Sequence, residues 1–251
     1  MTRLLLVNPN MTCEMTDRLA AVARRAASAG TEIVPLTATR GFPYISSRAE
    51  SLIAGTIALE MIAEHREGAD AVVIAAYGDP GLRAARELFD IPVVGMAEAA
   101  MLTSCMLGET FGLVTFTPRM TPWYRDNVVE AGLTGRFVGM RTPPEAVGPV
   151  TLVAQTMRDM LLALARESAL EDGADVVILG GAPLAGLAET FAEDCPAVLV
   201  DPVSAAVRQA ETLAKLAPRG AHRGRFARPP GKPSEGLHPA LARLIAEGAA
   251  A

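Results

Sequence analysis

The chain has 251 residues, half of them hydrophobic, and a formal net charge of -5 at pH 7. A chain of this length and composition can bury a large core, so it does not need disulfides or a structural metal to fold. The negative charge and an aromatic content of 4% disfavour nucleic-acid binding, which relies on positive surface and base stacking.

The chain begins with an apolar run, Leu4 to Val7, that is too short for a signal-peptide core or a membrane span. We therefore expect a cytoplasmic protein without a membrane partner. Cys13, Cys105 and Cys195 are widely spaced, odd in number and form no CxxC pair. The sequence thus predicts neither a disulfide framework nor a metal site.

Short β-branched runs alternate with longer Ala- and Leu-rich segments at helical spacing. This alternation predicts parallel strands joined by crossover helices. Ser47 and Glu50 form a capping-box pattern for a helix that runs toward Arg66, and Gly30 and Gly173 stand where helices should end. The predicted strands are Leu4 to Val7, Glu32 to Leu36, Ala71 to Ala75, Pro92 to Gly95, Gly112 to Phe116, Arg136 to Met140, Asp175 to Leu179 and Ala197 to Val200.

An internal repeat organises these elements. GADAVVIAAYG, which begins at Gly68, aligns without gaps with GADVVILGGAP, which begins at Gly173. The runs IPVVGMAEAA, ending at Ala100, and AVLVDPVSAA, ending at Ala206, also match. The repeat predicts two related α/β halves.

We divide the chain accordingly into two domains. Residues 1–100 plus 203–251 are predicted to form the first domain, with a return helix from about Val203, and residues 101–202 the second. The Gly-, Pro- and Arg-rich segment 217–236 is typical of an exposed connector, and a short final helix is expected from His238 to about Glu247.

Two turns follow equivalent strands of the repeat: IAAYGDPGL, from Ile74, and ILGGAPLAG, from Ile178. Ligands of open α/β sheets bind outside the carboxyl ends of the strands, so these turns should face each other across one cleft. Neither turn contains a cysteine or a histidine. Asp79 precedes Pro80 at a helix entrance, where it could cap the helix, position a ligand, or do both.

The glycines of the second turn do not have GxGxxG spacing, because Ala182 occupies the second glycine position. We expect Gly180 and Gly181 to keep side chains out of the cleft rather than to bind a dinucleotide. Asn8 and Asn10 follow one strand, and Thr115 and Thr117 occupy the corresponding place in the second half. Their amides and hydroxyls suit a small polar ligand, with turn formation as the alternative.

The motifs NPNMT, IAAYGDPGL, GLVTFTPRM, VVILGGAPLAG and DPVSAA, in this order, resemble the aspartate/glutamate/hydantoin racemase superfamily, and most closely its hydantoin racemase branch. The resemblance implies two pseudo-symmetric Rossmann-like α/β domains with parallel sheets, a cofactor-independent active site between them, and a homo-oligomer. It also implies two catalytic cysteines that flank the acidic carbon of the substrate. Those positions fall on Ala76 and Gly181, so both thiols are absent.

Proton transfer on both faces of a substrate needs a titratable group on each face, which neither alanine nor glycine supplies. Two-thiol racemisation is therefore disfavoured. Three hypotheses remain: an enzyme of this superfamily that acts on a small hydantoin-like or amino-acid-like substrate, a hydrolase or lyase that uses the same cleft, and a non-catalytic small-molecule binding protein. Tyr77 and Asp79 are the catalytic candidates. The substrate-binding candidates are Asn8, Asn10, Tyr44, Ala76, Gly78, Thr115, Thr117, Gly180, Gly181, Ala182 and Pro183.

Overall fold

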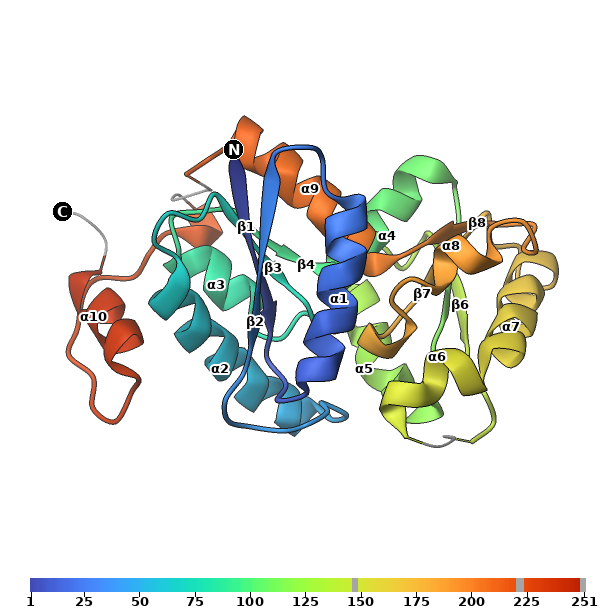
Figure 1. The fold of residues 1–251 in the computed structure, drawn as a ribbon, viewed down its shortest axis with the longest axis horizontal. Helices are drawn as coiled ribbons and strands as arrows, with labels where there is room; N and C mark the ends of the chain where they lie inside the picture. The colour runs from blue at the N-terminus through green and yellow to red at the C-terminus, as the bar shows by residue number, and fades with distance from the viewer. Residues whose placement is uncertain (146–148, 220–223, 249–251) are drawn as a thin grey trace.

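The computed structural model describes residues 1–145, 149–219 and 224–248. They form two four-stranded parallel sheets that lie side by side (Figure 1). The strand orders are β2-β1-β3-β4 in the first sheet and β6-β5-β7-β8 in the second. Since the two orders are equivalent, the prediction of two pseudo-symmetric α/β halves is confirmed.

All eight predicted strands are present, with ends shifted by about a residue or two, as is usual for element boundaries. The central strands β3 and β7 are buried along their whole length, as expected for parallel strands covered by helices on both faces. The strands are β1 (Thr2–Asn8), β2 (Thr31–Thr37), β3 (Ala71–Ile74), β4 (Val93–Gly95), β5 (Phe111–Val114), β6 (Phe137–Arg141), β7 (Val176–Leu179) and β8 (Val198–Val200).

Helix α2 begins where the Ser47 signal places it. Ser47 Oγ accepts a hydrogen bond from the Glu50 backbone N–H at 3.2 Å, which confirms the predicted N-cap. The Glu50 carboxylate, however, accepts from Ser46 rather than from Ser47. The helices are α1 (Cys13–Ala26), α2 (Arg48–His65), α3 (Leu82–Leu88), α4 (Met96–Leu107), α5 (Thr121–Glu130), α6 (Val153–Thr156), α7 (Arg158–Leu170), α8 (Leu187–Phe191), α9 (Pro202–Leu216) and α10 (Pro239–Glu247), with short 3-10 turns η1 (Pro118–Met120), η2 (Val150–Leu152), η3 (Ala182–Leu184) and η4 (Gly224–Phe226).

The C-terminal segment follows the prediction in outline. Helix α10 begins after His238, as expected, and packs against α2. The connector contains the short turn η4, which the sequence did not predict, and residues 220–223 of the connector lie outside the described residues. Within the described residues, no helix has both the length and the hydropathy of a membrane span.

The two halves exchange a helix. Helix α4 follows β4 of the first sheet but packs against β5, β7 and β8, whereas α9 follows β8 of the second sheet and packs against β1, β3 and β4. The two exchanged helices also pack against each other, at the junction between the sheets (Figure 1). The expected domain boundary between residues 100 and 101 therefore falls inside α4.

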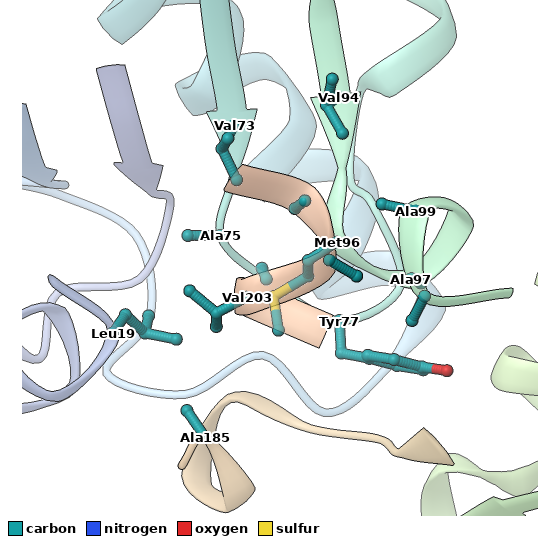
Figure 2. Close-up of a cluster of buried hydrophobic side chains, with 14 of the residues drawn as sticks. Leu19, Val73, Ala75, Tyr77, Val94, Met96, Ala97, Ala99, Ala185 and Val203 are labelled. Atoms are coloured by element: carbon teal, nitrogen blue, oxygen red, sulfur yellow. The ribbon is translucent and has the colours of Figure 1, made fainter. Parts of the chain in front are cut away.

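The exchanged helices meet in a buried apolar cluster that draws on both halves (Figure 2). Met96 at the start of α4 and Val203 in the first turn of α9 are inaccessible to solvent, as is Leu19 of α1. Tyr77 and Ala185, from the turns that follow β3 and β7, belong to the same cluster. Burial of each large side chain stabilises this arrangement by about 1.5–3 kcal/mol, so the ends of the two central strands are fixed relative to each other.

Glu211 attaches α9 to the edge of the first sheet. Its carboxylate accepts hydrogen bonds from the Ser28 backbone N–H at 2.7 Å, from Ser28 Oγ at 3.0 Å and from Thr31 Oγ1 at 2.6 Å. Burial of this carboxyl group acts to raise its pKa, but the hydrogen bonds from Thr31 and Ser28 outweigh burial and hold the pKa below its ordinary value.

We expect Glu211→Gln to lower the free energy of unfolding at pH 7 by about 1–3 kcal/mol, because the new amide N–H₂ would face hydrogen-bond donors. Since the folded-state pKa of Glu211 is lowered, its contribution is fully present above the unfolded value of 4.5 and is lost as the pH falls through the folded value. Urea unfolding measured from about pH 7 to pH 3 should therefore show that the difference in the free energy of unfolding between wild type and variant becomes smaller as the pH falls. A gap independent of pH would contradict this role.

Candidate active site

A cavity of about 270 Å³ lies at the carboxyl ends of β1, β3, β5 and β7, between the two halves. Ala76 and Gly181 are both part of its wall, so the two equivalent turns do face one pocket. This is the place where open α/β sheets bind ligands. The described lining consists of Asn10, Thr12, Met15, Pro43, Tyr44, Ile45, Ala76, Tyr77, Met120, Tyr124, Pro149, Val150, Thr151, Gly181, Ala182 and Pro183.

The structure brings together some of the candidate residues and separates others. The candidates in the wall are Asn10, Tyr44, Ala76, Tyr77, Gly181, Ala182 and Pro183. The candidates outside the described wall are Asn8, Gly78, Asp79, Thr115, Thr117 and Gly180. Sequence reasoning gave no role to Met15, Pro43, Ile45, Met120 or the segment 149–151, because these residues carry no polar motif and reach the pocket only through the fold.

Asn8 and Asn10 form a buried hydrogen-bond network after β1. Asn8 Nδ2 donates to Asn10 Oδ1 at 3.1 Å and to Thr16 Oγ1 at 2.9 Å. Asn10 Oδ1 also accepts from the Thr12 backbone N–H at 2.9 Å. Because a backbone N–H must meet an oxygen, these contacts fix the amide orientation of Asn10. Among the described residues the Nδ2 group of Asn10 donates no hydrogen bond, and Asn10 borders the pocket.

The other candidates outside the pocket wall have surroundings of three kinds: a helix cap, a buried hydroxyl and close contact with an aromatic ring. Thr117 Oγ1 accepts from the Arg119 backbone N–H and caps η1. Thr115 is fully buried, and its hydroxyl has no hydrogen-bond partner among the described residues. Gly180 lies under the ring of Tyr77, and Gly78 lies against Trp123, so in both places a side chain would meet an aromatic ring.

Tyr44 and Tyr77 border the pocket with their rings. Their hydroxyls are buried and have no hydrogen-bond partner in the described structure. Tyr77 packs edge to face on Tyr124, with ring centroids 4.6 Å apart. Burial raises the pKa of Tyr77 well above 10, with a further increase from the nearby Asp79, and burial together with Glu50 raises the pKa of Tyr44. Both tyrosines are therefore neutral at pH 7 and can donate a hydrogen bond, but they cannot act as bases.

Asp79 connects its turn to the start of α4. Its Oδ1 accepts from the Ala97 backbone N–H at 2.9 Å and its Oδ2 from the Glu98 backbone N–H at 2.8 Å. Asp79 has a positive φ of 49°, which is uncommon outside glycine. The carboxylate occupies the space above Gly95, where a Cβ would lie 2.7 Å from Oδ1 and closer still to Cγ. Asp79 thus caps α4 rather than α3, the helix that follows it in sequence.

Burial raises the pKa of Asp79 to about 7, against the hydrogen bonds from Ala97 and Glu98, which lower it. Asp79 borders two other hollows, which are lined by residues of α2, α3, α4 and α5. The group could exchange a proton near neutral pH, but the structure places it outside the described wall of the pocket between the halves.

The second half also joins a turn to the start of a helix through a carboxylate, but there the carboxylate lies at the start of the helix instead of in the turn. Asp201, which aligns with Gly95 in the repeat, accepts from the Ser204 backbone N–H at 2.9 Å and from the Gly186 backbone N–H at 2.7 Å. It therefore joins the start of α9 to the turn after β7. In the first half the acid belongs to the turn, whereas in the second half it belongs to the helix.

Gly181, at which the resemblance assigns the second thiol, has a backbone conformation that disfavours a side chain. Its φ is +132°, a conformation that residues with a Cβ rarely adopt. A Cβ built on Gly181 would also lie 2.8 Å from Cε1 of Phe116. At Ala76, by contrast, a Cβ is already present and borders the pocket.

The described lining contains no carboxylate, thiol, imidazole or amine. Its polar side chains are those of Asn10, Thr12, Tyr44, Tyr77, Tyr124 and Thr151. The pocket can therefore hold a small polar ring by hydrogen bonds and apolar contact. It offers neutral donors to a developing negative charge but no side chain that could remove a proton at neutral pH.

Comparisons with known proteins agree with this geometry. The family model for Asp/Glu/Hydantoin racemase matches residues 4–210. A hydantoin racemase from Paenarthrobacter aurescens is 35% identical over 216 residues, which is 85% of this chain and 92% of that protein. A hydantoin racemase from Pseudomonas sp. (strain NS671) is 34% identical and covers 84% and 85% of the two chains. The structure of an allantoin racemase from Klebsiella pneumoniae superimposes with a TM-score of 0.89 at 33% identity, covering 96% of this chain and 99% of that one.

We expect Gly95→Ala to lower the free energy of unfolding by about 1–3 kcal/mol, because its Cβ would enter the space of the Asp79 carboxylate. In an Asp79→Ala background the same change should cost much less, since the obstructing group is gone. A double-mutant cycle by urea unfolding measures this coupling, which should exceed about 0.5 kcal/mol. Strictly additive effects would contradict the proposed contact.

We expect Ala76→Cys to change the free energy of unfolding by less than about 1 kcal/mol, because the extra sulfur enters the pocket. Gly181→Cys should cost about 1–3 kcal/mol, because it places a Cβ at a strained φ and against Phe116. Gly181→Ala is the matched control for the backbone effect. Equal stability of all three variants would show that the turn relaxes freely.

Proposed function

The chain belongs to the Asp/Glu/hydantoin racemase family, and on that premise we propose that it is a cofactor-independent enzyme that acts on a small hydantoin-like or amino-acid-like substrate by a route other than two-thiol racemisation. The observation that carries the proposal is the pocket whose wall contains Ala76 and Gly181. It lies between the two halves, where the resemblance places an active site, and its described lining has no thiol. Its volume of about 270 Å³ is at the small end of ligand sites, which suits one ring with a substituent.

Neutral hydrogen-bond donors supply the chemistry in this proposal. Asn10 Nδ2 is positioned by the network after β1 to donate to a ring carbonyl. The hydroxyls of Tyr44 and Tyr77 are buried and have no hydrogen-bond partner among the described residues, and a small movement of either ring would bring its hydroxyl to a ligand oxygen in the pocket. Donors of this kind stabilise an enolate more than the neutral carbonyl, because the negative charge develops on oxygen as the α-proton leaves.

Solvent then serves as the proton carrier. Water or hydroxide removes the proton from the acidic carbon, the electron pair moves onto the carbonyl oxygen, and water returns a proton to the same carbon. Return to the opposite face gives racemisation, and return to the same face gives exchange with retention. In this scheme Tyr77 acts as a donor, and Asp79 holds the turn that carries Tyr77 against α4.

A binding protein without catalysis is the second candidate. The observation that favours it is the described lining itself, which has no side chain able to act as a base at neutral pH. A binder and a solvent-assisted enzyme would use the same donors and differ only in turnover.

The deciding experiment follows 5-benzylhydantoin, allantoin and a panel of free amino acids in heavy water by proton NMR. We expect enzyme-dependent loss of the α-hydrogen with the ring intact, at a rate that rises with pH and has no plateau between about pH 5 and 8 because solvent is the base. Tyr77→Phe should slow this exchange by about 100-fold, as expected for the loss of one oxyanion donor.

Other outcomes assign the function differently. A rate plateau with an apparent pKa of about 7 that disappears in Asp79→Asn would make Asp79 the base. Opening of the ring would indicate a hydrolase. Binding without exchange above the protein-free control would indicate a binding protein.

A further inference from the structure

Arg18 joins the first half to two parts of the pocket wall in the second half. It lies on α1, one turn after Met15, which borders the pocket. Its Nη1 donates to the Pro183 carbonyl oxygen at 2.9 Å and its Nη2 to the Thr151 carbonyl oxygen at 2.8 Å. Both carbonyls belong to residues of the pocket wall, so one guanidinium spans two segments that are about thirty positions apart in sequence.

The two carbonyls are suited to a planar cation. Pro183 lies in η3 and Thr151 in η2, and the carbonyl groups of such short turns have few partners within the turn. A positive charge near these carbonyl ends is favourable, and the fixed fork of a guanidinium presents a separate nitrogen to each carbonyl, whereas an ammonium would have to serve both from a single nitrogen. The side chain of Arg18 is partly buried, so water competes less for these bonds.

Arg25, farther along α1, offers a contrast. It forms an ion pair with Glu189 of the second half at 3.4 Å, and both side chains are more than half exposed. Arg25 therefore crosses the same junction without touching the pocket wall. It is a matched control for loss of a positive charge on this face of α1.

The residues just before α1 contact another part of the pocket wall, in the first half. Thr12 Oγ1 donates to the Pro43 carbonyl oxygen at 2.6 Å, and the Met11 backbone N–H donates to the Phe42 carbonyl oxygen at 2.9 Å. Pro43 borders the pocket next to Tyr44. Helix α1 thus touches the wall on two sides, through Thr12 in its own half and through Arg18 across the junction.

We propose that Arg18 is a positioning residue that holds the η3 turn and the segment 149–151 against α1 and so sets the width of the pocket and the retention of its ligand. The effect on ligand retention rests on the proposed function, whereas the hold on η3 and on the segment 149–151 does not. Arg18 acts through the two carbonyls and needs no contact with the ligand.

The test compares Arg18→Met, Arg18→Lys and Arg25→Met in the full chain by hydrogen exchange with mass spectrometry. The Leu184 amide, which donates to the Gly181 carbonyl oxygen at 2.9 Å, and the Leu152 amide, which donates to the Pro149 carbonyl oxygen at 3.0 Å, report on the two segments. We expect exchange in both segments to rise at least about 10-fold in Arg18→Met and to stay at the wild-type rate in Arg25→Met. Arg18→Lys keeps the positive charge and the aliphatic part of the side chain, and it replaces Arg18→Met if that variant does not fold. We expect its amide exchange rates in the two segments to lie between those of wild type and Arg18→Met.

The second readout is the affinity for 5-benzylhydantoin, measured by ligand-observed NMR, together with KM and kcat if turnover is found. Arg18→Met should raise the dissociation constant or KM at least about 5-fold while kcat changes less than about 2-fold, a split that general destabilisation would not produce. Unchanged exchange in the two segments would overturn the proposal, as would faster exchange with unchanged affinity. If wild type binds none of the probe, the function proposed above fails on this substrate, and the exchange data alone decide the role of Arg18.

Discussion

The exchange of α4 and α9 between the two halves is the constraint on which the rest of the structure depends. Each helix continues from one sheet and packs on the other, so neither half can be moved without breaking the buried contacts around Met96 and Val203 (Figure 2). The carboxyl ends of β3 and β7 are therefore held at a fixed separation. The pocket with Ala76 and Gly181 in its wall is a consequence of that separation.

In each half one carboxylate joins the exchanged helix to a turn. In the first half the carboxylate comes from the turn, and in the second half it comes from the start of the helix. Asp79 reaches from the turn to the start of α4, and Asp201 reaches from the start of α9 back to the turn. Gly95 is the necessary complement, because the carboxylate of Asp79 fills the space that a side chain there would need. An acidic residue in a turn near a candidate ligand pocket can thus serve helix packing, even when burial raises its pKa toward neutrality.

The two positions at which the resemblance assigns cysteines differ from each other in local structure. Ala76 keeps a Cβ in the pocket wall and differs from a cysteine by one sulfur atom. Gly181 has a backbone conformation that disfavours any side chain and lies against Phe116. The pocket therefore has one face that could accept a thiol with little change and one face whose turn would first have to be rebuilt.

The strands, the repeat and the resemblance to the family could be predicted from the amino-acid sequence, because each depends on residues that are close together along the chain. The gapless match between the segments from Gly68 and Gly173 predicted that two turns would meet, and seven candidates, among them Asn10 and Tyr77, do border one pocket. The apolar part of the wall, such as Met15 and Met120, could not be predicted, because an apolar residue at helical spacing does not reveal whether it faces the core or a cavity.

The roles of the charged residues Asp79 and Arg18 became visible in the folded chain. Asp79 precedes α3 in sequence yet caps α4, because the strand order places the start of α4 beside its turn. Arg18 has no motif around it, and its two carbonyl partners are 133 and 165 positions away. Hydrogen bonds over such distances depend on how the halves pack, and no local pattern of residues encodes that packing. The sequence therefore determined where the pocket would be, and the fold decided which side chains form it and which hold it in place.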